Sequence, residues 1–232
     1  MCSTASQAMN KPLSGAADPD KARKRRQPIR DAQASNTRAA IIKAATDMFV
    51  ENGYYSTAVR DIAERANVTS GALIHHFRTK EQLFLAVFDQ LETEMLQSAH
   101  SHAARNDACS LTGLWSGIGY FLACATNVEF QRIVLIEGPK VFGWDRWRDL
   151  EEGYSLGRLK ELLGSYMDQG VVKRLDLDHL SKIVFSMIIE SGIIVARSSN
   201  PKREHPAISA CLFNVLSGIC VEKNEAPSSP VL

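Results

Sequence analysis

The chain has 232 residues and 45% of them are hydrophobic, which is enough for a substantial core in one domain or in a small module joined to a larger one. The formal net charge is +1, so overall basicity does not point to a nucleic-acid partner. No apolar run reaches the roughly 18 residues of a membrane-spanning helix, and the N-terminus lacks an apolar signal core. We therefore predict a cytoplasmic protein that does not contact a membrane.

The five cysteines form no CxxC pair; they are Cys2, Cys109, Cys124, Cys211 and Cys220. Their odd number, wide spacing and apolar neighbours favour buried free thiols in a reducing compartment. A redox-sensing thiol stays open as the alternative, because it requires a lowered pKa that a sequence does not reveal.

The first 35 residues differ in composition from the rest. They hold seven Lys/Arg against three Asp/Glu, including the run Lys21–Arg26, and they have few large apolar residues. Such a segment cannot bury enough apolar surface to order itself, so we predict a disordered basic arm over residues 1–35. The arm is either a solvated tail or a source of salt-sensitive affinity for DNA.

Helix-forming residues dominate the remainder, and no run alternates in the way a strand does, so we predict an all-α fold of about nine helices. A first helix is expected from near Thr37 to Gly53, where glycine is a natural stop. Its apolar face consists of Ile41, Ile42, Ala45, Met48 and Phe49.

Residues 57–84, TAVRDIAERANVTSGALIHHFRTKEQLF, have the layout of a helix-turn-helix. Asn67 can close the first helix because asparagine tolerates the left-handed conformation, and Val68 can fill the angle between the helices. Thr69 or Ser70 can cap the second helix with a hydroxyl group. The second helix can then lie in a DNA major groove.

A long helix is expected to open at Lys80, and a break is expected over residues 106–110. Turn signals at Gly138-Pro139, Gly170, Asn200-Pro201 and His205-Pro206 divide the rest. The predicted helices cover roughly 111–126, 128–137, 145–168, 176–199 and 206–222, before a loose tail over 224–232. We thus predict a helix-turn-helix domain over 36–82 and a second helical domain over 83–223.

The helices over 176–199 and 206–222 are apolar on more than one face. Such helices need burial on two sides. One side can be the core, and the other is expected to contact a second subunit.

Residues 37–84 resemble the DNA-binding domain of the tetracycline-repressor (TetR) family of bacterial transcriptional regulators. The resemblance lies in AATDMFVENGYYSTAVRDIA, in the turn ERANVTSGALIHHF and in the KEQLF that opens the next helix. The segment RIVLIEGPKVFGWDRWRDLEE is similar to one found in a branch of TetR-type C-terminal domains.

The resemblance implies a homodimer, formed here through 176–199 and 206–222, that binds double-stranded operator DNA of near-palindromic sequence. It implies a repressor that a small-molecule effector releases from the operator, and it is compatible with an activator. The alternative is a helical ligand-binding or interaction protein whose operator binding is lost or altered.

By the same resemblance, the DNA contacts are expected from Thr57, Arg60, Thr69, Ser70, Gly71, Ala72, Ile74, His75 and Lys80. Thr57, Arg60, His75 and Lys80 are expected at phosphates, with Arg60 also able to reach a base edge, and Ala72 at a thymine methyl. The family most often has tyrosine where this chain has Ile74, so the contact set is expected to differ there.

A ligand cavity is expected among the middle helices. The candidates, each of which can equally be ordinary core, are Trp115, Phe121, Cys124, Ile133, Glu137, Trp144, Trp147, Tyr166, Met187 and Glu190. Glu137 and Glu190 fall in apolar surroundings, where each can bind a cationic or hydroxylated ligand or pair with Arg132 or Arg197.

No motif of an enzyme is present: GxSxG, HExxH, P-loop and GxGxxG are all missing from the sequence. Glu151-Glu152 is interpreted as a charged helix face. Adjacent His75 and His76 point ~100° apart on a helix and do not make the pair that a helical metal site uses. We predict no enzyme activity, no cofactor and no metal.

Overall fold

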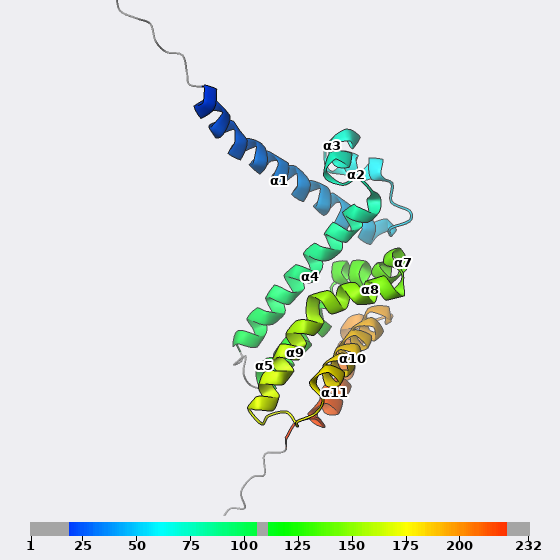
Figure 1. Ribbon diagram of the computed structural model, residues 1–232. Coiled ribbons are helices and arrows are strands. Elements are labelled where there is room, and N and C mark those ends of the chain that lie inside the picture. Colours follow the sequence, from blue (N-terminus) through cyan, green and yellow to red (C-terminus); the bar gives the residue numbers. More distant parts are fainter. Residues whose placement is uncertain (1–18, 106–110, 222–232) are drawn as a thin grey trace, which may run out of the picture. The chain divides into compact units, whose positions relative to one another are not determined.

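The computed structural model describes residues 19–105 and 111–221 (Figure 1). The prediction of an all-α protein is confirmed, since these residues form helices joined by short turns and include no strand. Val172 and Cys220 form one isolated β-bridge between the ends of two helices. The tail over 224–232 and the break over 106–110 lie outside the described residues, as do Cys2 and Cys109.

Helix α1 spans Pro19–Asn52 and begins earlier than expected. The prediction of disorder over residues 1–35 is therefore wrong for residues 19–35, while residues 1–18 are not described. Lys, Arg, Ala and Gln dominate residues 21–35 and are among the strongest helix formers, so the chain continues the helix despite Pro28. The chain divides into two compact units, Met1–Ala39 and Ala40–Leu232, and all packing described below lies in the second.

Three helices form the N-terminal module: the end of α1, α2 (Val59–Arg65) and α3 (Ser70–His76). Asn67 adopts the expected left-handed conformation, with φ of 54°, and Gly53 ends α1 with φ of 78°. Thr69 caps α3, because its hydroxyl accepts a hydrogen bond from the Ala72 amide at 3.1 Å. The module has a buried core of Ile41, Ala45, Phe49, Ile62, Leu73 and Phe77.

Helix α4 (Lys80–Arg105) starts in this module and packs along α5 (Leu111–Cys124) in the C-terminal domain. The next segment consists of α6 (Val128–Phe130), the π-helical η1 (Gln131–Glu137) and α7 (Gly138–Phe142). The predicted joint at Gly138-Pro139 is wrong, because the turn comes at Gly143, whose φ is 79°. Gly138 serves packing instead: a Cβ there would lie 2.9 Å from Cδ1 of Trp147.

The expected helix over 145–168 is α8 (Trp144–Glu151), the π-helical η2 (Glu152–Leu156) and α9 (Gly157–Asp168) in one continuous run. Helices α10 (Leu177–Arg197) and α11 (Pro201–Ser217) pack against each other. Helix α11 begins at Pro201, because Asn200 caps it by accepting a hydrogen bond from the Arg203 amide. The helix continues through Pro206.

Two expectations drawn from composition need comment. Cys124, Cys211 and Cys220 are free thiols as predicted, but Cys211 is exposed and the other two are half-buried. Helix α10 has the length and hydropathy of a membrane span, and more than half of its apolar window is buried inside the protein. Burial of this extent is typical of the core helix of a soluble protein.

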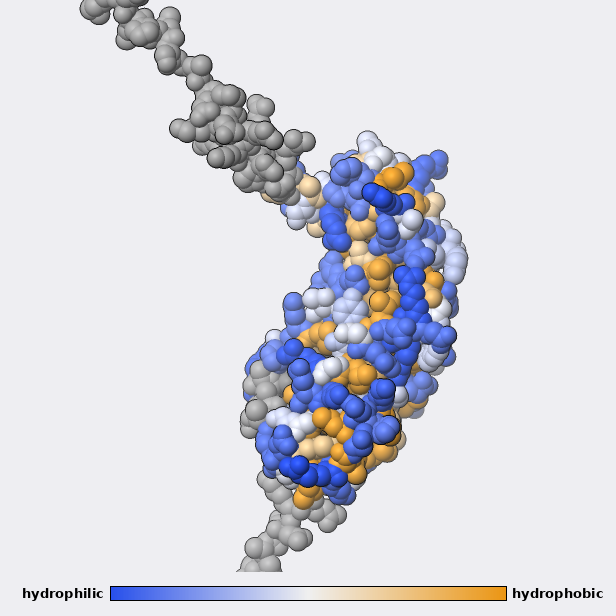
Figure 2. All heavy atoms as spheres, viewed as in Figure 1, coloured by the Kyte–Doolittle hydropathy of each residue, from blue (hydrophilic) through white to orange (hydrophobic). Residues whose placement is uncertain are grey.

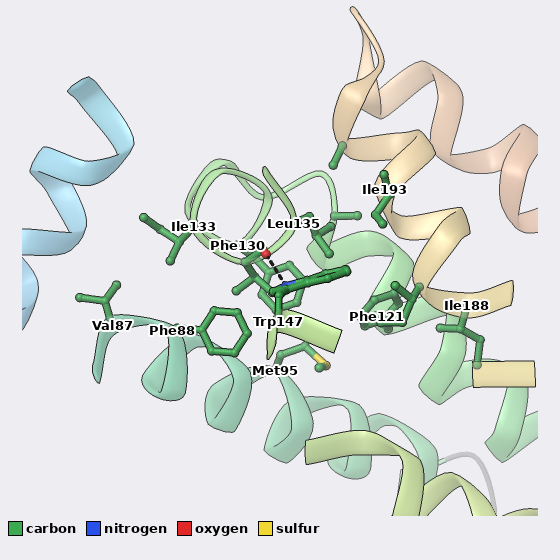
Figure 3. Close-up of a cluster of buried hydrophobic side chains, with 14 of the residues drawn as sticks. Val87, Phe88, Met95, Phe121, Phe130, Ile133, Leu135, Trp147, Ile188 and Ile193 are labelled. Atoms are coloured by element: carbon green, nitrogen blue, oxygen red, sulfur yellow. Dashed lines mark hydrogen bonds between the residues drawn. The ribbon is translucent and has the colours of Figure 1, made fainter. Parts of the chain in front are cut away.

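Trp147 lies at the centre of the C-terminal core. Figure 3 shows its indole among Phe88, Phe130 and Ile133, with the ring nitrogen bonded to a carbonyl oxygen. The side chain is fully buried, and Nε1 donates to the Val134 carbonyl at 3.0 Å. The expectation that Trp147 lines a ligand cavity is thus not met, because the ring is enclosed by core side chains.

We expect Trp147→Phe to lower the free energy of unfolding by roughly 2–3 kcal/mol, because it removes buried volume and leaves the Val134 carbonyl without this donor. Urea unfolding followed by circular dichroism at 222 nm measures the change. Trp144→Phe is the matched control, since Trp144 is 53% exposed, and should cost less than about 0.5 kcal/mol. Equal losses in the two variants would contradict the assignment of Trp147 as the core residue.

Candidate DNA-binding surface and ligand cavity

Helix α3 presents a small exposed surface to solvent. Leu73 and Phe77 are buried against the module, which leaves Ser70, Gly71, Ile74 and His75 exposed on the outer side. Ile74 is 54% exposed, so of the two orientations considered for it the side chain takes the outward one. Thr69 and Ala72 lie at the start of the same helix, where the cap bond joins them. The structure brings these predicted DNA-contacting residues together on one face.

Two exposed cations lie on the segments that precede and follow α3. Arg60 is exposed on α2 and has a single weak ion pair, 3.7 Å long, with the neighbouring Asp61. Arg78 is exposed in the turn that joins α3 to α4, and the sequence reasoning missed it. The signal in the sequence was a basic residue directly after Phe77, the buried residue that caps the end of α3. Arg65, by contrast, is held by both carboxylate oxygens of Glu51 at 2.6 and 2.7 Å.

Thr57 does not fit the role expected for it. The side chain is buried, and its hydroxyl lies 2.8 Å from the Gly53 carbonyl and 3.2 Å from the Met48 carbonyl, to which it donates. The Thr57 amide also donates within the turn, to the Tyr54 carbonyl. The hydroxyl therefore ties the start of α2 to the end of α1 and is not available to a phosphate.

Lys80 has a structural role that the sequence did not reveal. Its ammonium group donates to the Thr57 carbonyl at 2.8 Å and lies 4.3 Å from the centre of the Tyr54 ring. Burial of the ammonium lowers the pKa of Lys80. The phosphate contact expected of Lys80 remains a prediction, but the side chain already joins α4 to the turn before α2.

One buried carboxylate connects this module to the C-terminal domain. Glu137, at the end of η1, accepts from the Tyr54 amide at 3.1 Å and from the Lys140 ammonium at 2.9 Å, with Arg132 at 3.7 Å. The sequence left two alternatives for Glu137, a ligand contact or a pair with Arg132. The structure has the pair, and Glu137 is not in the wall of the cavity described below. The φ of 78° favours glycine at position 53, and a Cβ there would also lie 3.2 Å from the Arg132 guanidinium, which is a tight contact.

The balance of forces on Glu137 can be read from its pKa. Burial acts to raise the pKa of the carboxyl, but hydrogen bonds from Lys140 and the Tyr54 amide, with the charges of Lys140 and Arg132, bring it below 4.5. A carboxyl with a depressed folded-state pKa stabilises the protein above its unfolded-state pKa, and this contribution is lost as the pH falls through the folded value.

We therefore expect Glu137→Gln to lower the free energy of unfolding by about 1–2 kcal/mol at pH 7, because the amide keeps one acceptor and loses the ion pairs. The difference from the parent protein should stay constant down to about pH 5 and shrink toward pH 3. Urea titrations across this range measure it. Glu64→Gln, at an exposed position on α2, should change stability little at any pH; a constant difference for Glu137→Gln down to pH 3 would contradict the pairing.

A separate cavity of about 330 Å³ lies in the C-terminal domain between α4, α5, η2–α9 and α10. Its wall is mostly apolar, and its size is at the lower end for a small-molecule site. The lining residues are Met95, Leu96, Ala99, His100, Gly113, Gly117, Ile118, Phe121, Ser155, Arg158, Leu159, Glu161, Leu162, Tyr166, Phe185, Ile188 and Ile189.

Of the predicted cavity residues, the structure places only Phe121 and Tyr166 in this wall. Trp144 and Glu190 are exposed, and Trp115 packs on Phe213 with ring centres 5.4 Å apart. Ile133 is buried core, and Cys124 and Met187 are half-buried outside the cavity wall. Helical periodicity identified apolar faces correctly, but it does not say which face meets which.

Four polar side chains of the cavity wall were missed, namely His100, Ser155, Arg158 and Glu161. Arg158 donates to His100 at 2.9 Å across its edge, and Glu161 follows one turn further along α9. Arg158 and Glu161 lie on one face of α9 at i, i+3 spacing, which was the only signal in the sequence.

Glu151 also departs from expectation. It was interpreted as part of a charged helix face, but the side chain is fully buried, as is Glu92 on α4. Burial raises the pKa of both carboxyls, and the charge of Glu92 raises that of Glu151 further. The spacing of charges on α8 could not show this burial, because it depends on packing against other helices and Glu92 lies on α4.

Comparison with known proteins agrees with this architecture. Residues 41–87 match the family described as bacterial regulatory proteins, tetR family, and residues 111–219 match the tetracyclin repressor-like C-terminal domain. A repressor of Mycobacterium tuberculosis, Rv3405c, is 49% identical over 65 residues, or 28% of this chain and 35% of that protein. The chain therefore matches only about a third of that curated relative's length.

Two longer similarities extend over both domains. The probable acrEF/envCD operon repressor of Escherichia coli is 27% identical over 213 residues, covering 83% of this chain and 91% of that protein. The crystal structure of a TetR-family transcriptional regulator from Pectobacterium atrosepticum has a TM-score of 0.73 and 27% identity, covering 82% of this chain and 97% of that one. With matches over residues 41–87 and 111–219, this chain belongs to the TetR family of transcriptional regulators.

Proposed function

We propose that the protein is a cytoplasmic, dimeric transcriptional repressor that binds operator DNA through α3 and leaves it when a small molecule fills the cavity. The observation that carries the proposal is the exposed face of Gly71, Ile74 and His75 on α3, with exposed Arg60 on α2 and exposed Arg78 in the turn after α3. Such a face offers contacts to base edges at its centre and to phosphates at its sides.

The route from cavity to DNA runs along α4. Its start follows α3 after a short turn, and its later residues Met95, Leu96 and Ala99 line the cavity. A ligand that favours a different position of α4 would change the position of α3 and so disfavour the operator-bound state. Coupling between two such sites is typically ~1–3 kcal/mol, which corresponds to a loss of DNA affinity of roughly 5–150-fold.

The dimer is supported by apolar residues left uncovered on the last two helices. Ile183 and Ile194 are exposed on one face of α10, since they stand eleven residues, or three turns, apart. Val215 is exposed on α11, which packs beside α10. Figure 2 shows hydrophobic residues reaching the surface of the C-terminal helices among hydrophilic ones. A two-fold contact through this face would space two α3 helices for two half-sites.

A rival function has specific support. The buried hydroxyl of Thr57 and the isoleucine at position 74 remove two phosphate contacts that are usual in the family, and the Lys80 ammonium is already bonded to the Thr57 carbonyl. A helical ligand-binding protein that has lost operator binding would fit these features.

The two functions separate in one titration. Purified protein is titrated with the DNA upstream of its own gene at two salt concentrations, and the repressor should bind it selectively over unrelated DNA. We expect Arg60→Ala to weaken binding to all sequences about five- to tenfold and to reduce the salt slope by about 1, because it removes one phosphate contact. Arg174→Ala, in the turn before α10, should change neither quantity. A folded dimer without selective binding at low salt would favour the rival function.

The dimer contact has its own test. We expect Val215→Glu to lower the association constant at least tenfold, because an unpaired charge would be buried at the contact. Val128→Glu is the matched control, since both valines are 59% exposed and Val128 lies on α6. Sedimentation equilibrium measures both variants, and dissociation by neither or by both would contradict a dimer through α10 and α11.

A further inference from the structure

Two fully buried carboxyl groups lie in the C-terminal domain without any partner. Glu92 projects from α4 and Glu151 from the end of α8. All four of their carboxyl oxygens lack a hydrogen bond among the described residues. A buried polar group that makes no hydrogen bond costs several kcal/mol in an apolar environment, and a charged one costs more.

Among the described residues, none donates a hydrogen bond to either carboxyl. The negative charge of Glu92 acts to raise the pKa of Glu151, of Tyr154 and of Cys124. Tyr154 donates its proton to Asp89, and burial keeps the Cys124 thiol neutral by raising its pKa to about 11. Within the described part of the chain, Arg148 is the one cation that acts on Glu151, and it is held by Ser186 at 2.6 Å and Glu152 at 3.6 Å.

Neither carboxyl belongs to the cavity wall itself, but each lies one turn from residues that do. Met95 and Leu96 line the cavity one turn after Glu92 on α4, and Ser155 lines it one turn after Glu151. Residues three and four apart share a helix face, so Glu92 and Glu151 project from the same faces as these lining residues. Met95 belongs to the core cluster drawn in Figure 3, and its unbranched side chain can change rotamer without moving the backbone.

We propose that Glu92 and Glu151 form the polar end of the ligand site and bind the protonated amine of a hydrophobic organic amine whose apolar body fills the cavity. This inference rests on the proposed role of the cavity as the effector site. A primary ammonium group brings three N–H donors and a positive charge to a pair of carboxyl groups whose four oxygens lack donors. Its binding would favour the ionised carboxyls that burial alone disfavours.

A matched series of small probes tests the proposal on the full-length protein by isothermal titration calorimetry. The probes are 4-phenylbutylamine, 4-phenylbutan-1-ol and 4-phenylbutanoate, which share one apolar body and differ in the charge of the head group. We expect the amine to bind roughly tenfold or more tightly than the alcohol, and the carboxylate to bind least, because charge-assisted hydrogen bonds are the strong ones. An amine that binds no better than the alcohol, or not at all, overturns the proposal.

Three isosteric variants locate the effect. Glu92→Gln and Glu151→Gln should each lower the affinity for the amine about tenfold and leave that for the alcohol within about twofold. Glu64→Gln, at an exposed position on α2 outside the cavity wall, should change neither. Equal losses for amine and alcohol would indicate a structural role for the pair. The comparison of the three probes on the unmodified protein decides the question even if a variant does not fold.

The outcome is separable from that of the proposed function. Selective operator binding by the ligand-free protein, with no preference for the amine, would overturn this inference alone. A preference for the amine in a protein that binds no operator would support the amine site and contradict the repressor.

Discussion

The arrangement of the two domains depends on one buried carboxylate. Glu137 receives hydrogen bonds from the backbone amide of Tyr54 and from Lys140, with Arg132 beside it, so it joins the turn after α1 to the end of η1. Gly53 has φ of 78°, a conformation that glycine adopts readily, and its lack of a side chain eases the close approach of the turn to Arg132 and Glu137. The Tyr55 hydroxyl adds a second connection, to the Lys140 carbonyl at 3.0 Å.

This connection constrains the movement of α4. The module is attached to the C-terminal domain both through α4 itself and through the Tyr54–Glu137 bond, so α4 cannot move at the cavity without changing one attachment or the other. Lys80 adds to the constraint, because it binds the Thr57 carbonyl at the very start of α4. A side chain expected to serve DNA binding thus holds the module in the position from which α3 can reach DNA. Coupling of this kind needs two discrete arrangements of one element, which packed helices provide.

The local conformation of the N-terminal module was predicted well from short stretches of sequence. Asn67 in the left-handed conformation, Thr69 as the cap of α3 and Gly53 as the stop of α1 follow from backbone chemistry within a few residues. Features that depend on contacts distant in sequence were not predictable. Thr57, Glu151 and Glu190 were each assigned the wrong environment, because burial of a polar side chain is decided by the helix that packs on it. The prediction of the cavity lining was wrong for the same reason. The aromatic residues that stand out in the sequence are Trp144, which lies on the surface, and Trp147, which lies in the core.

The buried carboxyls of the C-terminal domain show how the same residue type takes opposite roles. Glu137 has donors on every side, and these bring its pKa below the ordinary value despite burial. Glu92 and Glu151 receive no hydrogen bond from any described residue, and burial raises the pKa of each. A satisfied carboxylate stabilises the fold that surrounds it, whereas an unsatisfied pair lowers stability until a donor arrives. An apolar residue at position 92 or 151 would avoid this cost. Two carboxyls beside an apolar cavity are instead what a site for a hydrophobic cation requires.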